Sequence, residues 1–154
     1  SGRIRKGDTL LDYGCGKGRV DCYLAYQTRC RSIGVEYDLR IYEAAEENKE
    51  TAVAGGRTEF VLADAGEFPV PDAVNRAYFF NPFSVELLQK VIRRILDSWY
   101  EVPREIRLFF YYPSDEYLAY LMTVDELVFA DEIDCRDLFD GKDERERIVE
   151  FVLE

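Results

Sequence analysis

Short apolar runs alternate along most of this chain with segments in which apolar residues recur at helical spacing. The apolar runs predict strands over residues 8–13, 31–38, 58–65, 75–83 and 105–113. Composition and spacing predict helices over residues 17–29, 39–53 and 84–99. The last helix has the clearest amphipathic face, formed by Val85, Leu88, Ile92, Ile95 and Trp99. Nearly continuous apolar strands joined by helices indicate a parallel sheet that is covered on both faces.

The C-terminal part of the chain has a different pattern. Residues 127–135 and 147–154 are both typical of strands, and the segment between them is too polar for a covering helix. They predict a hairpin, which places an antiparallel strand in or beside the parallel sheet. Since no repeat, linker or low-complexity segment interrupts the sequence, we expect residues 1–154 to form a single domain.

The composition of the chain limits the kinds of molecule that we expect it to bind. The chain is 47% hydrophobic and 14% aromatic, as in folded globular proteins, and no apolar run reaches the roughly 20 residues of a membrane helix. We therefore expect a cytoplasmic protein without a membrane partner. The formal net charge of −11 repels phosphate backbones and predicts against binding to nucleic acid.

The sequence contains no histidine, and its four cysteines form no CxxC pair. The lack of histidine excludes Ser-His-Asp and Cys-His catalysis and any imidazole base. We expect no metal site and four reduced thiols. The cysteines are Cys15, Cys22, Cys30 and Cys135.

The segment LLDYGCGKGRV, residues 10–20, places a glycine-rich turn directly after the first predicted strand. In a parallel sheet, ligands bind beyond the carboxyl ends of the strands. The spacing differs from the dinucleotide pattern G-x-G-x-x-G, because Arg19 stands at the third glycine, and no G-K-[ST] closes a P-loop. Asp12 would repel a pyrophosphate but suits an ammonium group, and the next helix N-terminus suits a carboxylate. The pattern predicts a ligand with an amino-acid end; a turn without a ligand is the alternative.

Two further acids follow the next two predicted strands. Glu36 at the end of the second strand could accept both hydroxyl protons of a ribose, and its alternative is an exposed charge at a strand end. Asp64 at the end of the third strand could accept from the amine of adenine, and its alternative is a helix N-cap. Contacts to an ammonium group, a ribose and an adenine together indicate S-adenosylmethionine.

Four segments carry a resemblance to a known family. LLDYGCGKGRV, GVEYD, VLADAGEF and YFFNPFS resemble the successive motifs of class I S-adenosylmethionine-dependent methyltransferases, over about residues 8–84. The resemblance implies a Rossmann-like α/β fold, with an open sheet of seven strands in the order 3-2-1-4-5-7-6. That sheet is mostly parallel with one antiparallel strand, and helices cover both faces. It also implies an enzyme that uses S-adenosyl-L-methionine as its cofactor.

The resemblance assigns roles to individual positions. Asp12 and the glycines hold the methionine part, Glu36 holds the ribose, and Asp64 with Ala65 holds the adenine, against whose edge Tyr37 packs. The residues implied to bind the cofactor are Asp12, Gly14, Cys15, Gly16, Gly18, Glu36, Tyr37, Asp64, Ala65 and Asn81.

Asn81 is also the candidate catalytic residue. In many amine methyltransferases of this class a D/N-P-P-[FY] motif accepts a hydrogen bond from the target amine. The sequence here is N-P-F-S, which lacks the second proline of that motif. A helix N-cap is the alternative role for Asn81. Tyr111 and Tyr112, at the end of the fifth predicted strand, could form an aromatic wall for a cationic or planar substrate. Packing in the core is the alternative for these two tyrosines.

The leading hypothesis is a methyltransferase acting on an unidentified acceptor, for which we expect an amine of a protein or small molecule. The alternative is a non-catalytic S-adenosylmethionine-binding module that serves as a sensor or an assembly subunit. A nicotinamide oxidoreductase is a third hypothesis, which Arg19 opposes. Because only about seven residues precede the first predicted strand, we also expect that a natural N-terminal segment covering the pocket is missing.

Overall fold

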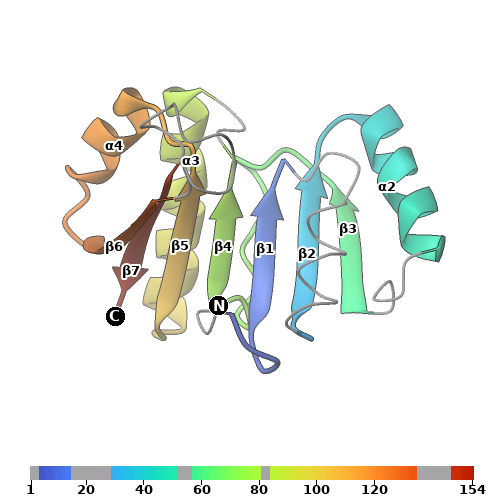
Figure 1. Ribbon diagram of the computed structural model, residues 1–154, viewed down its shortest axis with the longest axis horizontal. Coiled ribbons are helices and arrows are strands. Elements are labelled where there is room, and N and C mark those ends of the chain that lie inside the picture. Colours follow the sequence, from blue (N-terminus) through green and yellow to red (C-terminus); the bar gives the residue numbers. More distant parts are fainter. Residues whose placement is uncertain (1–3, 15–28, 52–56, 81–83, 135–146) are drawn as a thin grey trace.

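A computed structural model describes residues 4–14, 29–51, 57–80, 84–134 and 147–154, and these contain a seven-stranded sheet (Figure 1). Its strand order is β3-β2-β1-β4-β5-β7-β6, which confirms the predicted fold class and the C-terminal hairpin. The strands are β1 (Thr9–Tyr13), β2 (Arg31–Glu36), β3 (Thr58–Leu62), β4 (Arg76–Phe79), β5 (Ile106–Tyr111), β6 (Val128–Asp134) and β7 (Arg147–Leu153).

The strand order reverses at β1. This strand pairs in parallel with β2 on one side and with β4 on the other, so that Tyr13 lies opposite both Val35 and Phe79. β3 and β5 extend the parallel sheet, whereas β7 is antiparallel to both β5 and β6. The carboxyl ends of β1 to β5 consequently meet at one edge, the upper edge in Figure 1. The switch point between β1 and β4 is where such sheets bind ligands.

Helix α3 (Val85–Glu101) lies behind β4 and β5 in the view of Figure 1. Its N-cap is Ser84, whose hydroxyl oxygen accepts from the backbone N–H of Leu87 at 3.2 Å, so the capping interpretation of Asn81 is wrong. The amphipathic prediction is confirmed for the centre of the predicted face, and the two outer residues of that face are half-buried. The buried residues of α3 are Leu88, Val91, Ile92, Ile95 and Ser98.

Two further helices accompany the sheet within the described residues. Helix α2 (Leu39–Thr51) packs on β3 through a small cluster of Ala45, Phe60 and Tyr42. Helix α4 (Asp115–Leu121) was not expected from the sequence, because seven residues are too few to establish a helical period. It buries Tyr117 and Leu121 beside α3. No helix in the described part of the chain is both long and apolar enough to cross a membrane.

A row of aromatic rings crosses the core beneath the carboxyl edge. Tyr13, Phe79 and Phe110 occupy the same level of β1, β4 and β5, and all three are fully buried. Their rings stack with centroids 5.0 Å apart for Tyr13 and Phe79 and 4.5 Å apart for Phe79 and Phe110. Because burying one large apolar side chain stabilises a fold by about 1.5–3 kcal/mol, this row gives the edge above it a rigid support.

Four strands end earlier than the sequence predicts. β2, β3, β4 and β5 end at residues 36, 62, 79 and 111, whereas the apolar runs continue for two to four residues more. Asp64 therefore lies in a turn after β3, and Tyr112 lies beyond β5 with a φ of 53°, in the left-handed region. The predicted helix over 17–29 lies outside the described residues, except for its last position.

Candidate functional site

A pocket of about 200 Å³ opens at the carboxyl edge of the sheet, next to the switch point. Its residues come from the ends of β1 to β4, from the segments that follow them, and from the first turn of α3. They are Gly14, Val35, Glu36, Tyr37, Ala63, Asp64, Ala65, Phe80 and Leu87. Five predicted cofactor-binding residues are thus brought together: Gly14, Glu36, Tyr37, Asp64 and Ala65.

Gly14 begins the turn out of β1. Its φ of 66° lies in the left-handed region, which glycine adopts without a steric penalty. Its backbone N–H donates to the carbonyl oxygen of Val35 at 2.9 Å, so the β1–β2 ladder extends one residue into the pocket. The first glycine of the sequence motif therefore permits both the hydrogen bond and the change of direction.

Glu36 is the buried acid of the pocket. Only 6% of this residue is exposed, so the interpretation as an exposed strand-end charge is wrong. Its Oε2 accepts from the backbone N–H groups of Tyr37 and Asp38, each at 3.1 Å. Its own carbonyl oxygen accepts from Ala63 at 2.9 Å, which ties the end of β2 to the segment after β3. These contacts fix the carboxylate at the pocket wall.

Asp64 forms a turn rather than a helix cap. Its Oδ1 accepts from the backbone N–H of Gly66 at 2.9 Å, and its carbonyl oxygen accepts from Glu67 and Phe68 at 3.0 Å. Residues 65–74 contain no helix, so the N-cap interpretation is wrong. The turn keeps an exposed carboxylate at the pocket, on the side where β3 ends.

Two aromatic side chains line the pocket while exposing most of their surface. Tyr37, directly after β2, is 79% exposed, and Phe80, directly after β4, is 57% exposed. The ring of Phe80 stacks on Tyr111 of β5 with centroids 5.1 Å apart. Exposed rings beside a pocket provide surfaces that a planar ligand can cover.

The remaining predicted residues divide into two groups. Asp12 is buried in β1, where it lies opposite Gly34 and Tyr78, and it does not line the pocket. The others lie outside the described residues, so their roles stay predictions; they are Cys15, Gly16, Gly18 and Asn81.

The sequence analysis missed four residues of the pocket. Val35 and Ala63 directly precede the two predicted acids, so their places in the strand and turn could have identified them. Phe80 belongs to the fourth motif but reads as part of a strand. Leu87 is one of several apolar residues in α3, and no sequence signal separates it from the core.

The donor set fits the adenosine part of S-adenosylmethionine. A fixed carboxylate suits a pair of ribose hydroxyls, and the alanine, valine and leucine side chains suit the faces of a planar base. The volume is below the roughly 300–1,000 Å³ of typical small-molecule sites, so it would accommodate part of the cofactor. Among the described residues, no group of three or more acids or cysteines is placed to hold a metal ion.

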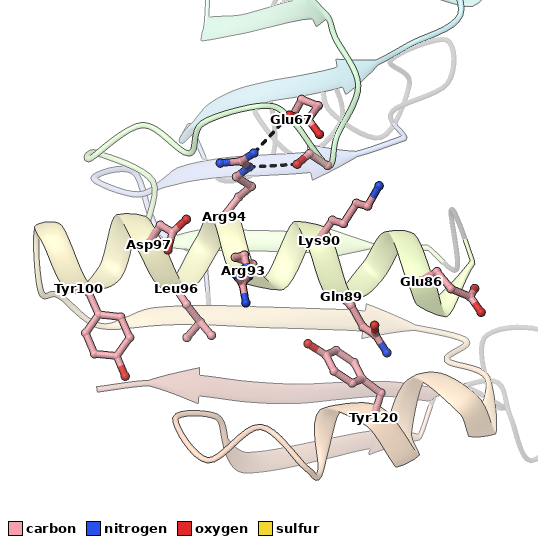
Figure 2. A pocket seen from close by; sticks show the side chains of 11 residues that line it. Glu67, Glu86, Gln89, Lys90, Arg93, Arg94, Leu96, Asp97, Tyr100 and Tyr120 are labelled. Carbon is pink, nitrogen blue, oxygen red and sulfur yellow. Dashed lines mark hydrogen bonds and ion pairs between the residues drawn. The ribbon is translucent and has the colours of Figure 1, made fainter.

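A larger hollow of about 930 Å³ lies along the outer side of α3. Figure 2 shows Arg94 directed at the segment after β3, where its Nε donates to the carbonyl oxygen of Gly66 at 3.0 Å and its Nη2 contacts Glu67 at 3.2 Å. Tyr120 of α4 lines the opposite side. No predicted cofactor residue that the structure describes lines this hollow.

The chain is similar to proteins of one enzyme class. It is 29% identical over 105 residues to the 27-O-demethylrifamycin SV methyltransferase of Amycolatopsis mediterranei, a match that covers 68% of this chain. The chain spans only 36% of the length of that relative.

Solved structures share the fold. Magnesium protoporphyrin IX methyltransferase from Synechocystis, with bound S-adenosylmethionine, superposes with a TM-score of 0.70 at 16% identity, covering 99% of this chain and 73% of that one. An RNA methyltransferase from Salinibacter ruber, in complex with S-adenosyl-L-homocysteine, has a TM-score of 0.64 at 17% identity, with coverage of 97% and 83%.

The family assignment rests on the sequence itself. Residues 10–105 match the family described as methyltransferase domain, and this range includes the glycine turn, both pocket acids and α3. The strand order and the position of the pocket agree with that match. The chain belongs to the class I S-adenosylmethionine-dependent methyltransferases.

Proposed function

We propose that this chain catalyses methyl transfer from S-adenosylmethionine and that the pocket between β1, β2, β3 and β4 binds the adenosine part of the cofactor. The observation that carries this proposal is the meeting of Gly14, Glu36 and Asp64 in one pocket at the switch point of the sheet. The match of residues 10–105 to the methyltransferase family supports it. Family membership also favours catalysis over a non-catalytic binding module.

Each wall of the pocket has a role in this proposal. Glu36, held by two backbone N–H groups, accepts from the ribose hydroxyls. Asp64 accepts from the amine of adenine, and Tyr37 covers the edge of the base. Gly14 lets the chain turn close to the methionine part, and Asp12 is proposed to attract its ammonium group.

When bound, S-adenosylmethionine would supply a methyl group whose carbon is made electrophilic by the positively charged sulfur, with S-adenosylhomocysteine as the leaving product. The protein must align the acceptor atom with the methyl carbon and exclude water. Asn81 follows Phe80, a residue of the pocket wall, and remains the proposed contact for the acceptor. An amine is the acceptor that this asparagine would suit.

The nature of the acceptor is open at this level. The relatives named above act, by their names, on a rifamycin, a protoporphyrin and RNA. These acceptors belong to different classes of molecule, so the relatives do not select one. The net charge of −11 supports a small molecule or a protein in preference to a nucleic acid.

Calorimetric titration with S-adenosylhomocysteine tests cofactor binding. We expect saturable one-to-one binding that Glu36→Gln weakens by about 10- to 100-fold, since a hydrogen bond to a charged group contributes about 1.5–3 kcal/mol. Glu59→Gln, at an exposed position of β3, is the matched control and should leave the affinity unchanged. No heat at millimolar ligand, or equal affinities for wild type and Glu36→Gln, would contradict the proposal.

Transfer of a labelled methyl group to a library of metabolites and cell extracts tests catalysis. An enzyme should label at least one acceptor, and Asn81→Ala should abolish labelling while still binding S-adenosylhomocysteine. A pure binding module should bind the ligand and label nothing.

A further inference from the structure

Three aromatic residues form a continuous surface at the ends of β4 and β5: Phe80, Tyr111 and Tyr112, here called the aromatic ledge. Phe80 and Tyr111 stack with centroids 5.1 Å apart and an interplanar angle of 26°. Tyr111 and Tyr112 follow with centroids 6.5 Å apart and an angle of 37°. Phe80 exposes 57% of its surface, and the two tyrosines are half-buried.

The sheet register determines where the ledge lies. Phe79 of β4 is paired with Phe110 of β5, so the residues that follow them, Phe80 and Tyr111, emerge side by side at the carboxyl edge. Phe80 also lines the cofactor pocket. The two acids of that pocket, Glu36 and Asp64, lie on its opposite side, where β2 and β3 end. The ledge therefore borders the cofactor pocket on the side away from the adenosine contacts.

Tyr112 is held in a strained conformation at the end of the ledge. Its φ of 53° is unfavourable for a residue with a side chain, at a cost of about 1–3 kcal/mol. Its backbone N–H donates to the carbonyl oxygen of Arg147 at 2.9 Å, which ties the residue after β5 to the start of β7. The hydrogen bond stabilises a conformation in which the chain leaves the sheet while the ring of Tyr112 stays beside Tyr111.

We propose that the aromatic ledge binds the methyl acceptor of the proposed reaction and that this acceptor is a planar aromatic molecule. The ring angles support this choice over a small cation. A cage for an ammonium group has rings that face one point from several directions. Phe80 and Tyr111 are instead stacked at an angle of 26°, and Tyr112 is tilted from Tyr111 by 37°, so the three rings do not converge on one point. Such an arrangement suits a further flat ring better than a small cation. The inference rests on the proposed function, because the ledge adjoins the proposed cofactor pocket.

The test measures binding of three probes to the full chain saturated with S-adenosylhomocysteine. The probes are a naphthalenediol, its fully saturated counterpart decalindiol, and choline. We expect the naphthalenediol to bind without displacing S-adenosylhomocysteine, and the other two to bind at least about tenfold more weakly, because neither can stack on the ledge.

Variants locate the site of binding. Phe80→Leu and Tyr111→Leu should weaken naphthalenediol binding by about tenfold, whereas Tyr111→Phe, which keeps the ring, should not. Tyr111→Leu should retain its affinity for S-adenosylhomocysteine, since Tyr111 does not line the cofactor pocket. Phe129→Leu, at a half-exposed aromatic position of β6, is the matched control for loss of a ring elsewhere.

The outcomes separate this inference from the proposed function. Binding of S-adenosylhomocysteine without naphthalenediol binding, or preferred binding of choline or decalindiol, would overturn the inference alone. Displacement of S-adenosylhomocysteine by the naphthalenediol, or equal binding by the wild type, Phe80→Leu and Tyr111→Leu, would do the same. Failure of S-adenosylhomocysteine itself to bind the wild type would overturn both.

Discussion

The backbone N–H of Gly14 donates to the carbonyl oxygen of Val35 at 2.9 Å, although Gly14 has already left the extended conformation of β1. This hydrogen bond joins the two central features of the pocket. It holds the start of the glycine turn against the end of β2, one residue before Glu36, and both partners line the pocket. The turn and the buried acid are therefore positioned by the same ladder.

Gly14→Ala should destabilise the protein and weaken the pocket. A left-handed conformation costs a residue with a side chain roughly 1–2 kcal/mol, and relief of this strain would break the contact with Val35. We expect the free energy of unfolding in urea to fall by about 1–2 kcal/mol and the affinity for S-adenosylhomocysteine to fall with it. Gly7→Ala is the matched control, because a Cβ there meets no atom within 4 Å and φ is not in the left-handed range. Equal losses in both variants would contradict this account of Gly14.

Asp64 is expected to combine a structural and a binding role, and two substitutions separate them. Asp64→Asn keeps an oxygen for the N–H of Gly66, so unfolding should change by less than about 0.5 kcal/mol, whereas Asp64→Ala should lose about 1 kcal/mol. Both should bind S-adenosylhomocysteine more weakly, since neither keeps a second acceptor oxygen. An analogue of S-adenosylhomocysteine with hydrogen in place of the adenine amine should bind wild type and Asp64→Asn alike; a difference would place Asp64 elsewhere.

The buried phenol of Tyr13 should make the stability of the protein depend on pH in the alkaline range. Burial raises the pKa of its phenol above the ordinary value of about 10. Above pH 10 the unfolded chain loses this proton while the folded protein keeps it. The contribution of Tyr13 to the free energy of unfolding is therefore fully present below about pH 10 and declines as the pH rises. Each pH unit above 10 should cost up to about 1.4 kcal/mol from this group, and Tyr13→Phe should remove that loss. Urea unfolding at pH 9, 10 and 11 measures it, and parallel pH dependences in the two proteins would contradict it.

The strand order could be predicted from the sequence, but the points where strands end could not. The resemblance of the four motifs to the family implied the order of the sheet, and the C-terminal hairpin agreed with it. Around Phe80 and Tyr112, however, apolar residues continue past the last ladder pair, because they form the pocket wall and the ledge instead of further strand. A run of apolar residues indicates contact with another surface, and that surface can be a ligand as well as the protein core. Such a run therefore overestimates the length of a strand that ends at a ligand-binding site.

Only part of the candidate site could be predicted from the sequence. Glu36 and Asp64 could be identified because acids after successive parallel strands meet at one edge. Asp12 has the chemistry for its proposed contact, but its burial within β1 could not be predicted from its sequence position. The role of Phe80 depends on the register of β4 with β5, which no short segment of the sequence encodes.

A crystal structure of the chain with S-adenosylhomocysteine tests the central claim most directly. The account predicts the ribose hydroxyls within hydrogen-bonding distance of the Glu36 carboxylate, the adenine beside Tyr37 and Asp64, and the sulfur directed toward Phe80. A ligand bound in the hollow along α3, or a ribose that does not contact Glu36, would contradict it.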